Sequence, residues 1–355
     1  MTHVSRRLPR FPAGRLLRKA VLDLRAALLF PIGVATYLTT GRTPPSGYQA
    51  LVWLFCSSGG RFNDVLSRAI AKRRPKLTIA EPVGVLGEMT PPLARETAER
   101  LRRDGCVVFE RALPEATCDR LFAFAMRTPA SVRRMDHEAR SPTPRMALFD
   151  PASPLAVRYD YPTADLLDNA DVQALLADGS ILALMQEYLG SRPVADVLSM
   201  WWHTRFHTQP DSEAAQFFHF DLDRIKWLKI FVYLTDVGPE NGPHSFVRGS
   251  HRTGGIPKAI LERGYVRLED EEVAAAFPAT DCLSLTAPRG SIIVEDTRGL
   301  HKGASVRGDA RLVLQLQFSN SLFGGFHPPA RVCEVRDPTF AKLLATSPEV
   351  FRQYT

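Results

Sequence analysis

From Val194 onward the chain alternates short apolar segments with turns, and this rhythm constrains the fold more than any other feature. Glycine, proline and asparagine, the residues that turns require, separate the apolar segments. A succession of short strands at this spacing is typical of a β-sandwich or a jelly roll. The clearest predicted strands are Val197–Phe206, Gln216–Phe220, Leu228–Thr235, Ser291–Glu295 and Arg311–Phe318.

The part of the chain before Val194 is predicted to be mostly helical. Apolar residues recur at helical spacing, and proline or glycine marks several ends. Helices are predicted over residues 14–30, 90–103, 114–126 and 181–189, with one strand over Cys106–Glu110. Because Pro and Gly are scattered between Arg73 and Glu88, that segment is predicted to be a linker. We therefore expect a largely helical N-terminal extension, residues 1–80, and a mainly β domain with flanking helices, residues 81–355.

The basic character of the chain belongs to its N-terminal part. Residues 1–76 hold fourteen Lys and Arg against two Asp, a net charge of +12, so the other 279 residues sum to −5 in a chain of net charge +7. Residues 14–40 could make peripheral contact with a membrane through an amphipathic helix. An ordinary surface helix with its arginines in water has the same pattern. No nucleic acid is expected, because these arginines are not interleaved with stacking aromatic residues.

Cysteine usage and the longest apolar run bear on the compartment. Five cysteines without a C-x-x-C pair are typical of a reduced cytosolic protein. The uncharged apolar run from Ala26 to Gly41 is interrupted by Pro31 and Gly33, and it is shorter than the ~20 residues of a membrane span. No cleavage site of the A-x-A type follows it, so an export signal is not predicted. We expect a cytoplasmic protein that could lie against the inner face of the membrane.

Two histidines and one aspartate form a candidate metal site. His219 and Asp221 lie two residues apart on a predicted strand, so their side chains share a face, and His301 follows another strand and a turn. Two imidazoles and one carboxylate are the ligand set of non-haem Fe(II) oxygenases and leave positions for a 2-oxo acid and O2. Arg311 opens the next strand, where a buried arginine needs an anionic partner, and the far carboxylate of a 2-oxo acid would supply one. The pattern predicts an oxygenase.

These residues resemble the phytanoyl-CoA dioxygenase family of non-haem iron, 2-oxoglutarate-dependent oxygenases. The resemblance covers roughly Leu93 to Ser319, and its motifs are residues 101–105 (LRRDG), 219–221 (HFD), 228–236 (LKIFVYLTD), 240–251 (ENGP to GSH) and 290–303. It implies a double-stranded β-helix, the cupin-like form of the jelly roll, with iron near its open mouth. It also implies that His219, Asp221 and His301 bind the iron and that Arg311 anchors the C5 carboxylate of 2-oxoglutarate.

The chain departs from the family pattern at two positions. Arg248 stands where the family often has a proline before its Gly-Ser-His turn, and Gly303 stands where some members place a hydroxyl that helps to hold the co-substrate. Another group must then assist Arg311, or Arg311 acts alone. The family alignment implies that Phe231 faces the site.

Strand alternation brings two neighbours of Phe231, Lys229 and Tyr233, to the same face. Lys229 is either a contact of 2-oxoglutarate or of an acidic substrate, or a surface lysine whose stem packs on apolar neighbours. Gln216 and Trp202 are candidates for the substrate pocket, although aromatic residues near a barrel are more often core. Asp223 is the one alternative carboxylate, and we expect it near the substrate entrance.

The resemblance implies hydroxylation of an unactivated C–H of a small-molecule or lipid/sugar-linked substrate, with release of succinate and CO2. Fe(II), 2-oxoglutarate and O2 are the expected cofactors, and ascorbate could support turnover. The carboxylate of Asp221 favours hydroxylation over halogenation and leaves desaturation and ring closure open. The alternatives are a non-catalytic membrane-associated barrel protein and another metal-dependent cupin-like enzyme.

Overall fold

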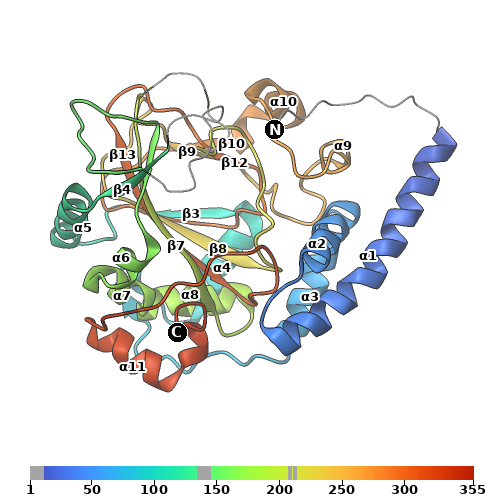
Figure 1. Ribbon diagram of the computed structural model, residues 1–355, viewed down its shortest axis with the longest axis horizontal. Helices are drawn as coiled ribbons and strands as arrows, with labels where there is room; N and C mark the ends of the chain where they lie inside the picture. The colour runs from blue at the N-terminus through green and yellow to red at the C-terminus, as the bar shows by residue number, and fades with distance from the viewer. Residues whose placement is uncertain (1–11, 134–144, 207–209, 211–213) are drawn as a thin grey trace.

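Two antiparallel sheets form the centre of the molecule (Figure 1). The computed structural model describes residues 12–133, 145–206, 210 and 214–355, with side chains from Lys19 onward. The larger sheet has its strands in the order β3 (Cys106–Phe109), β11 (Ile292–Glu295), β8 (Trp227–Tyr233), β13 (Arg311–Ser319), β7 (Val194–His203), β6 (Arg158–Asp160), β4 (Ala130–Arg133) and β5 (Met146–Ala147). The smaller sheet has the order β10 (Cys282–Leu285), β9 (His244–Val247) and β12 (His301–Gly303).

The inner faces of the two sheets enclose a small core. Trp201, Phe231, Ile293 and Val313 from the larger sheet pack in one buried cluster with Phe246 from the smaller sheet. Their positions follow the two-residue alternation of strands, so odd-numbered residues of β7, β8 and β13 point inward. This arrangement is a double-stranded β-helix, and it confirms the predicted jelly-roll core with flanking helices.

Helices cover the outer face of the larger sheet. They are α4 (Pro91–Asp104), α5 (Glu115–Arg127), α6 (Thr163–Leu167), α7 (Ala170–Leu176), α8 (Gly179–Leu189) and α11 (Pro338–Thr346) (Figure 1). Even-numbered strand residues such as Leu198, Ile230 and Leu314 meet these helices in the largest apolar cluster. Truncating any of them to alanine would cost about 2–5 kcal/mol of folding free energy, since each is fully buried.

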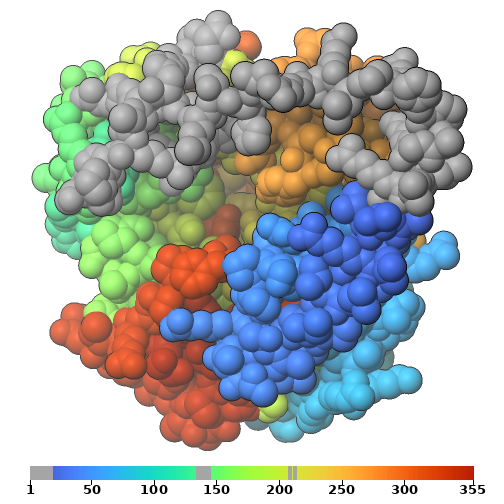
Figure 2. All heavy atoms as spheres, turned by 45° about the vertical axis from the view of Figure 1, so that its right-hand side comes forward, coloured from blue at the N-terminus to red at the C-terminus, as the bar shows by residue number. Residues whose placement is uncertain are grey.

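Three helices, α1 (Pro12–Thr40), α2 (Pro45–Ser58) and α3 (Arg61–Ala71), precede this domain and pack beside it. Leu51 and Phe55 of α2 are buried against the domain, whereas α1 runs along the outside (Figure 1). Figure 2 shows the N-terminal helices in blue beside the red C-terminal segment, where Arg352 donates a hydrogen bond of 2.5 Å to the Tyr37 hydroxyl. A short hairpin, β1 (Val83–Gly84) and β2 (Gly87–Glu88), lies in the predicted linker after α3.

Glycines fix how α1 meets α2. A Cβ added at Gly33 would lie 2.6 Å from Cα of Gly47, which is too close for two carbon atoms that are not bonded to each other. The two helices therefore approach at this point with backbone against backbone. Two short helices, α9 (Lys258–Leu261) and α10 (Asp270–Ala276), follow later, in a segment beside α2 (Figure 1).

Two predictions about secondary structure were wrong. Helix α1 continues through Pro31 and Gly33 to Thr40, although the sequence predicted a helix over residues 14–30 and an interrupted apolar run after it. Residues 19–40 are therefore long and apolar enough to cross a membrane, by length and composition. The predicted strand Gln216–Phe220 is reduced to two single bridges, Phe218 with Leu268 and His219 with His301. Because these partners belong to different segments, no continuous ladder forms.

Candidate metal centre

His219, Asp221 and His301 converge on one point. One potential ligand atom from each lies within 4.8 Å of the others, and all three residues are buried. Backbone hydrogen bonds set the arrangement: the amides of His219 and His301 donate to each other's carbonyl oxygens at 2.9 and 2.8 Å. The Asp221 amide donates to the carbonyl oxygen of Thr297 at 2.8 Å. The local backbone thus joins a motif three residues long to a histidine eighty residues later.

A backbone carbonyl orients each imidazole. Nδ1 of His219 lies 2.9 Å from the carbonyl oxygen of Phe217, and Nδ1 of His301 lies 3.0 Å from that of Gly299. Since a carbonyl oxygen only accepts, Nδ1 carries a proton in both rings, and in a neutral ring Nε2 keeps its lone pair. These Nε2 atoms lie 3.7 and 3.4 Å from the Asp221 carboxylate oxygens. Hydrogen bonds of this kind hold metal-binding histidines in protein sites.

The charge on Asp221 is balanced by Lys229 of β8. Lys229 Nζ donates to Asp221 Oδ2 at 2.6 Å and lies 3.1 Å from Asp223 Oδ2. Burial opposes ionisation of Asp221, but Lys229 and His301 together hold the pKa of this carboxyl well below its usual value. Burial and the neighbouring His301 lower the pKa of His219. A charged carboxylate beside a neutral imidazole is the protonation pattern that binds a divalent metal.

Arg311 of β13 lies buried on the same inner face. Its Nη2 is 2.8 Å from His203 Nδ1, while in the described part of the chain its Nε and Nη1 atoms have no hydrogen-bond partner. Burial lowers the pKa of Arg311, and the nearby Tyr233 hydroxyl only partly offsets this effect. Buried N–H donors left unpaired are unfavourable, and a carboxylate group would pair with one unpartnered edge of the guanidinium. A Cβ at position 303 would stand 3.0 Å from Arg311 Nη2, so Gly303 leaves space beside the guanidinium.

Residues 101–312 match the family described as "Phytanoyl-CoA dioxygenase (PhyH)". The chain belongs to the phytanoyl-CoA dioxygenase family. This membership confirms the predicted enzyme class, a dioxygenase that uses iron, 2-oxoglutarate and O2.

Individual relatives of this phytanoyl-CoA dioxygenase family member are remote. The ectoine dioxygenase of Stutzerimonas stutzeri (strain A1501) is 25% identical over 234 residues, which are 59% of this chain and 71% of the relative. Among solved structures, EctD from S. alaskensis in its apoform covers 75% of this chain and 92% of its own, at 19% identity and a TM-score of 0.47. The epimerase SnoN, in complex with Fe3+, alpha ketoglutarate and nogalamycin RO, covers 65% of this chain and 84% of its own, at 20% identity and a TM-score of 0.46.

The other candidate residues of this dioxygenase fall into two groups. Phe231 and Tyr233 share the inner face of β8 with Lys229, and the Tyr233 hydroxyl donates to the carbonyl oxygen of Leu285 at 3.0 Å. Gln216 is buried three residues before His219, and Asp223 is half-buried beside Lys229. These positions place Phe231, Tyr233 and Asp223 on the side of the sheet that carries the candidate metal ligands.

Trp202 does not lie where the sequence predicted it. Its ring stacks on Phe149 at 4.2 Å between centroids, and its Nε1 donates to the Tyr161 hydroxyl at 3.0 Å, both in the outer core. Alternation along β7 turns Trp202 outward and turns Trp201 into the barrel. The expectation that Trp202 lines the pocket was therefore wrong, because its neighbour Trp201 occupies the inner face.

Sequence reasoning missed a buried pair next to the metal ligands. Glu295 Oε2 of β11 lies 2.8 Å from His244 Nε2 of β9, and the His244 ring lies 5.5 Å from the ring of His301. Burial raises the pKa of Glu295 to about 8 and lowers that of His244. The signal that could have found the pair is the register of β11, where Glu295 stands opposite Lys229 on the inner face.

Proposed function

We propose that this dioxygenase holds one Fe(II) ion between His219, Asp221 and His301. The observation that carries the proposal is the convergence of three donor atoms within 4.8 Å, with both imidazole tautomers set by backbone carbonyls. Bound iron, 2-oxoglutarate and O2 supply the oxidising power that hydroxylates an unactivated C–H while 2-oxoglutarate becomes succinate and CO2. The carboxylate at Asp221 favours hydroxylation over halogenation.

The remaining inner residues bind and orient the co-substrate. Arg311 pairs one unpartnered edge of its guanidinium with the C5 carboxylate of 2-oxoglutarate. Phe231 and Tyr233 form the adjoining wall, and Gly303 leaves the room that the carboxylate needs. Lys229 already contacts two carboxylates, so we assign it first to holding Asp221 ionised and in place.

The substrate that we propose is a lipid-linked or otherwise amphiphilic small molecule met at a membrane surface. Five apolar side chains of α1 are mostly exposed, the first four of them at helical spacing, namely Val21 (57%), Leu24 (63%), Leu28 (59%), Ile32 (60%) and Leu38 (75%). We call these five residues the α1 stripe. The net charge of +12 on residues 1–76 complements an anionic bilayer. An anionic membrane is therefore the partner that fits both the apolar and the charged surface of residues 1–80, at the cytoplasmic face.

The extension also reaches the proposed active site. Tyr48 of α2 lies near Asp223 and Asp221, and its burial, together with these two charges, raises the pKa of its hydroxyl to about 12. Tyr265 is half exposed and packs edge-on against Phe220. Burial and the same two carboxylates raise the pKa of its hydroxyl. We infer that the substrate enters between these two tyrosines, beside Asp223. Residues 81–355 would then supply the chemistry, and residues 1–80 the access.

Two measurements test the metal and co-substrate sites. Anaerobic addition of Fe(II) and 2-oxoglutarate to the purified protein should give a weak visible charge-transfer band, and Arg311→Leu should require a higher 2-oxoglutarate concentration to reach it. Succinate formation coupled to a substrate separates the enzyme from a non-catalytic barrel. A cupin-like isomerase or hydrolase would turn over without O2 and 2-oxoglutarate, and that result would overturn the proposal.

A further inference from the structure

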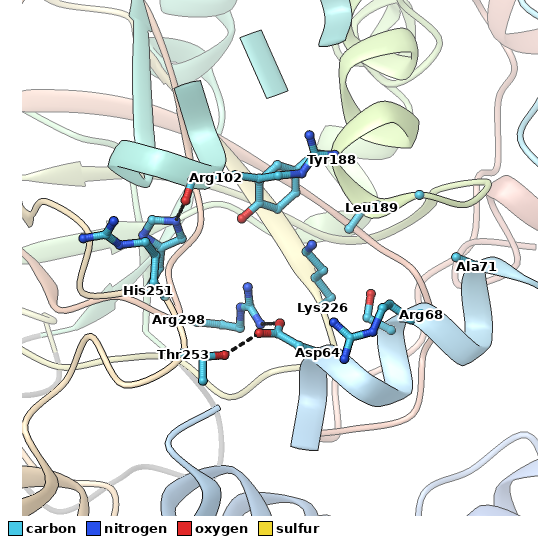
Figure 3. Close-up of a pocket in the computed structure, with 13 residues that line it drawn as sticks. Asp64, Arg68, Ala71, Arg102, Tyr188, Leu189, Lys226, His251, Thr253 and Arg298 are labelled. Atoms are coloured by element: carbon cyan, nitrogen blue, oxygen red, sulfur yellow. Dashed lines mark hydrogen bonds and ion pairs between the residues drawn. The ribbon is translucent and has the colours of Figure 1, made fainter. Parts of the chain in front are cut away.

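A second cavity lies outside the barrel, between the N-terminal helices and the catalytic domain. It has a volume of about 370 Å³ and is lined by α3, by the C-terminal ends of α4 and α8, and by the turns around residues 251–253 and 298 (Figure 3). None of the proposed iron ligands, nor Arg311, belongs to its lining. The cavity is thus separate from the site described above.

Positive charge dominates this cavity. Its lining contains five cationic side chains and one carboxylate, Asp64; the cations are Arg68, Arg102, Lys226, Arg252 and Arg298. Asp64 is already engaged, since it accepts hydrogen bonds from Thr253 at 2.6 Å and from Arg298 at 3.0 Å. Asp296, just behind the lining, pairs with Arg298 at 2.7 Å. Even with both carboxylates counted, three positive charges are left over.

The surplus cations lack acidic partners. In the described part of the chain neither Arg68 nor Lys226 forms an ion pair, and Arg102 donates to a backbone carbonyl, that of Glu187, at 2.7 Å. Lys226 Nζ lies 4.4 Å from the centre of the Tyr188 ring, and this cation–π contact stabilises its ammonium group. Burial and the charge of Arg298 lower the pKa of Lys226 to about 8. Like charges gathered in this way repel one another unless an anion lies between them.

We infer that this cavity binds the phosphate group of a small phosphorylated molecule. Figure 3 shows Arg68, Lys226 and Arg298 surrounding one space, so a phosphate there would meet cations from three separate segments. Guanidinium groups bind phosphate oxygens in pairs, and an ammonium group adds a compact positive charge. A dianionic phosphate matches a surplus of three charges better than a carboxylate does.

The size of the cavity indicates more than an inorganic ion. Small-molecule sites commonly enclose about 300–1,000 Å³, and this cavity lies within that range. The phosphate-bearing molecule can be a soluble metabolite or the headgroup of a lipid, since both present the same group. The inference does not rest on the proposed iron chemistry.

Binding can be measured directly on the full chain. Inorganic phosphate and glycerol 3-phosphate are titrated by calorimetry and by thermal unfolding, with NaCl added to keep the ionic strength constant. The wild type should show saturable binding and a rising Tm, with glycerol 3-phosphate the tighter ligand. Arg68→Gln combined with Lys226→Met should weaken the Kd about tenfold or more, because two charge-assisted contacts are lost.

The matched control removes two charges from the same region without touching the cavity. Arg61→Gln with Lys72→Gln alters exposed cations of α3 and its end, and its Kd should stay at the wild-type value. Equal weakening in both double variants would reduce the effect to overall charge and overturn the inference, as would the absence of saturable binding in the wild type. If Lys226→Met fails to fold, Arg68→Gln alone decides, since Arg68 is exposed on its helix.

A lipid arm separates the two sources of phosphate. Phosphatidylcholine vesicles with and without phosphatidic acid are sedimented with the wild type and with Arg68→Gln/Lys226→Met. A loss of phosphatidic acid-dependent binding in the variant identifies a headgroup as the ligand, whereas unchanged vesicle binding with weakened glycerol 3-phosphate binding identifies a soluble one. The Fe(II)–2-oxoglutarate band, measured on the same variants, should persist, so a failure here is distinguishable from a failure of the iron site.

Discussion

The metal centre and helix α1 depart in opposite directions from the usual distribution of side chains. The centre buries imidazoles, carboxylates, an ammonium and a guanidinium within an apolar barrel, whereas α1 presents a row of apolar side chains outward. Buried charge is tolerated where each group has a complement, as Asp221 has in Lys229. Contiguous exposed apolar surface marks a site of contact with a partner or a membrane. The metal centre is therefore suited to charged ligands, and the exposed face of α1 to an apolar surface.

The largest expected effect tests the metal centre at Asp221. Asp221→Ala removes one of three proposed ligands and should reduce substrate-coupled succinate formation by roughly a thousandfold or more, since a catalytic metal contributes several kcal/mol. Asp223→Ala is the matched control, because it removes a neighbouring carboxylate that also contacts Lys229. We expect it to retain at least a substantial part of the rate. Comparable losses in both variants would contradict the assignment of Asp221 to the metal.

The second prediction concerns the unpaired nitrogens of Arg311. Arg311→Lys keeps the charge but loses the fork of donors, so the KM for 2-oxoglutarate should rise by about 10–100-fold, in line with ~1.5–3 kcal/mol for charged hydrogen bonds. The kcat at saturating 2-oxoglutarate should change much less. Steady-state kinetics with varied 2-oxoglutarate separate the two parameters. Arg307→Lys, on the loop before β13, serves as the control, and an unchanged KM in Arg311→Lys would remove this residue from the co-substrate site.

The third prediction tests the opposite region, the α1 stripe. Leu24→Ser, Leu28→Ser and Ile32→Ser together should weaken binding to vesicles containing anionic lipid by at least about tenfold, because each buried aliphatic side chain contributes ~1.5–3 kcal/mol. Co-sedimentation with phosphatidylglycerol vesicles measures the effect. The control triple variant carries Val83→Ser, Leu93→Ser and Leu148→Ser, which are exposed to 57%, 45% and 53% elsewhere on the molecule.

The outcome of that comparison decides between the two readings of α1. If wild type and both triple variants sediment alike, the stripe is not a membrane-binding surface, and the helix is an ordinary covering element. Turnover of a water-soluble substrate should be unchanged in all three proteins, since all six positions are exposed and none belongs to the proposed metal or co-substrate site. A parallel loss of turnover would instead point to a structural defect.

The sequence predicted the parts of the site that depend on local geometry. A spacing of two residues in His219 and Asp221 was enough to place both on one face, and the motifs around His301 and Arg311 supplied the rest through the family resemblance. The His244–Glu295 pair escaped because its members meet across two sheets, so no spacing along the chain reports their contact. Trp202 was misplaced because two adjacent tryptophans leave the phase of alternation open until the register of β7 is known.

The length of α1 could not be obtained from composition either. Pro31 and Gly33 weaken a helix locally, because proline removes a backbone donor and glycine adds chain entropy. Packing against α2 outweighs both effects, and at Gly33 the missing side chain is what allows the two helices to approach. A residue that appears to break the helix in the sequence is therefore the residue that fixes its tertiary position.

The smallest expected effect follows from that contact. Gly33→Ala would bring a Cβ to 2.6 Å from the Gly47 Cα, and the two helices must separate to accommodate it. We expect a loss of about 1–3 kcal/mol in the free energy of unfolding, offset in part by alanine's better helix propensity. Gly41→Ala is a contrasting control, since no atom lies within 4 Å of a Cβ there, although its φ of 72° adds some backbone strain. Urea unfolding measures the free energy of unfolding. Succinate formation should stay at the wild-type rate in Gly33→Ala if α1 serves attachment and the barrel alone serves catalysis. A loss of turnover in this variant would show that the two regions are mechanically coupled.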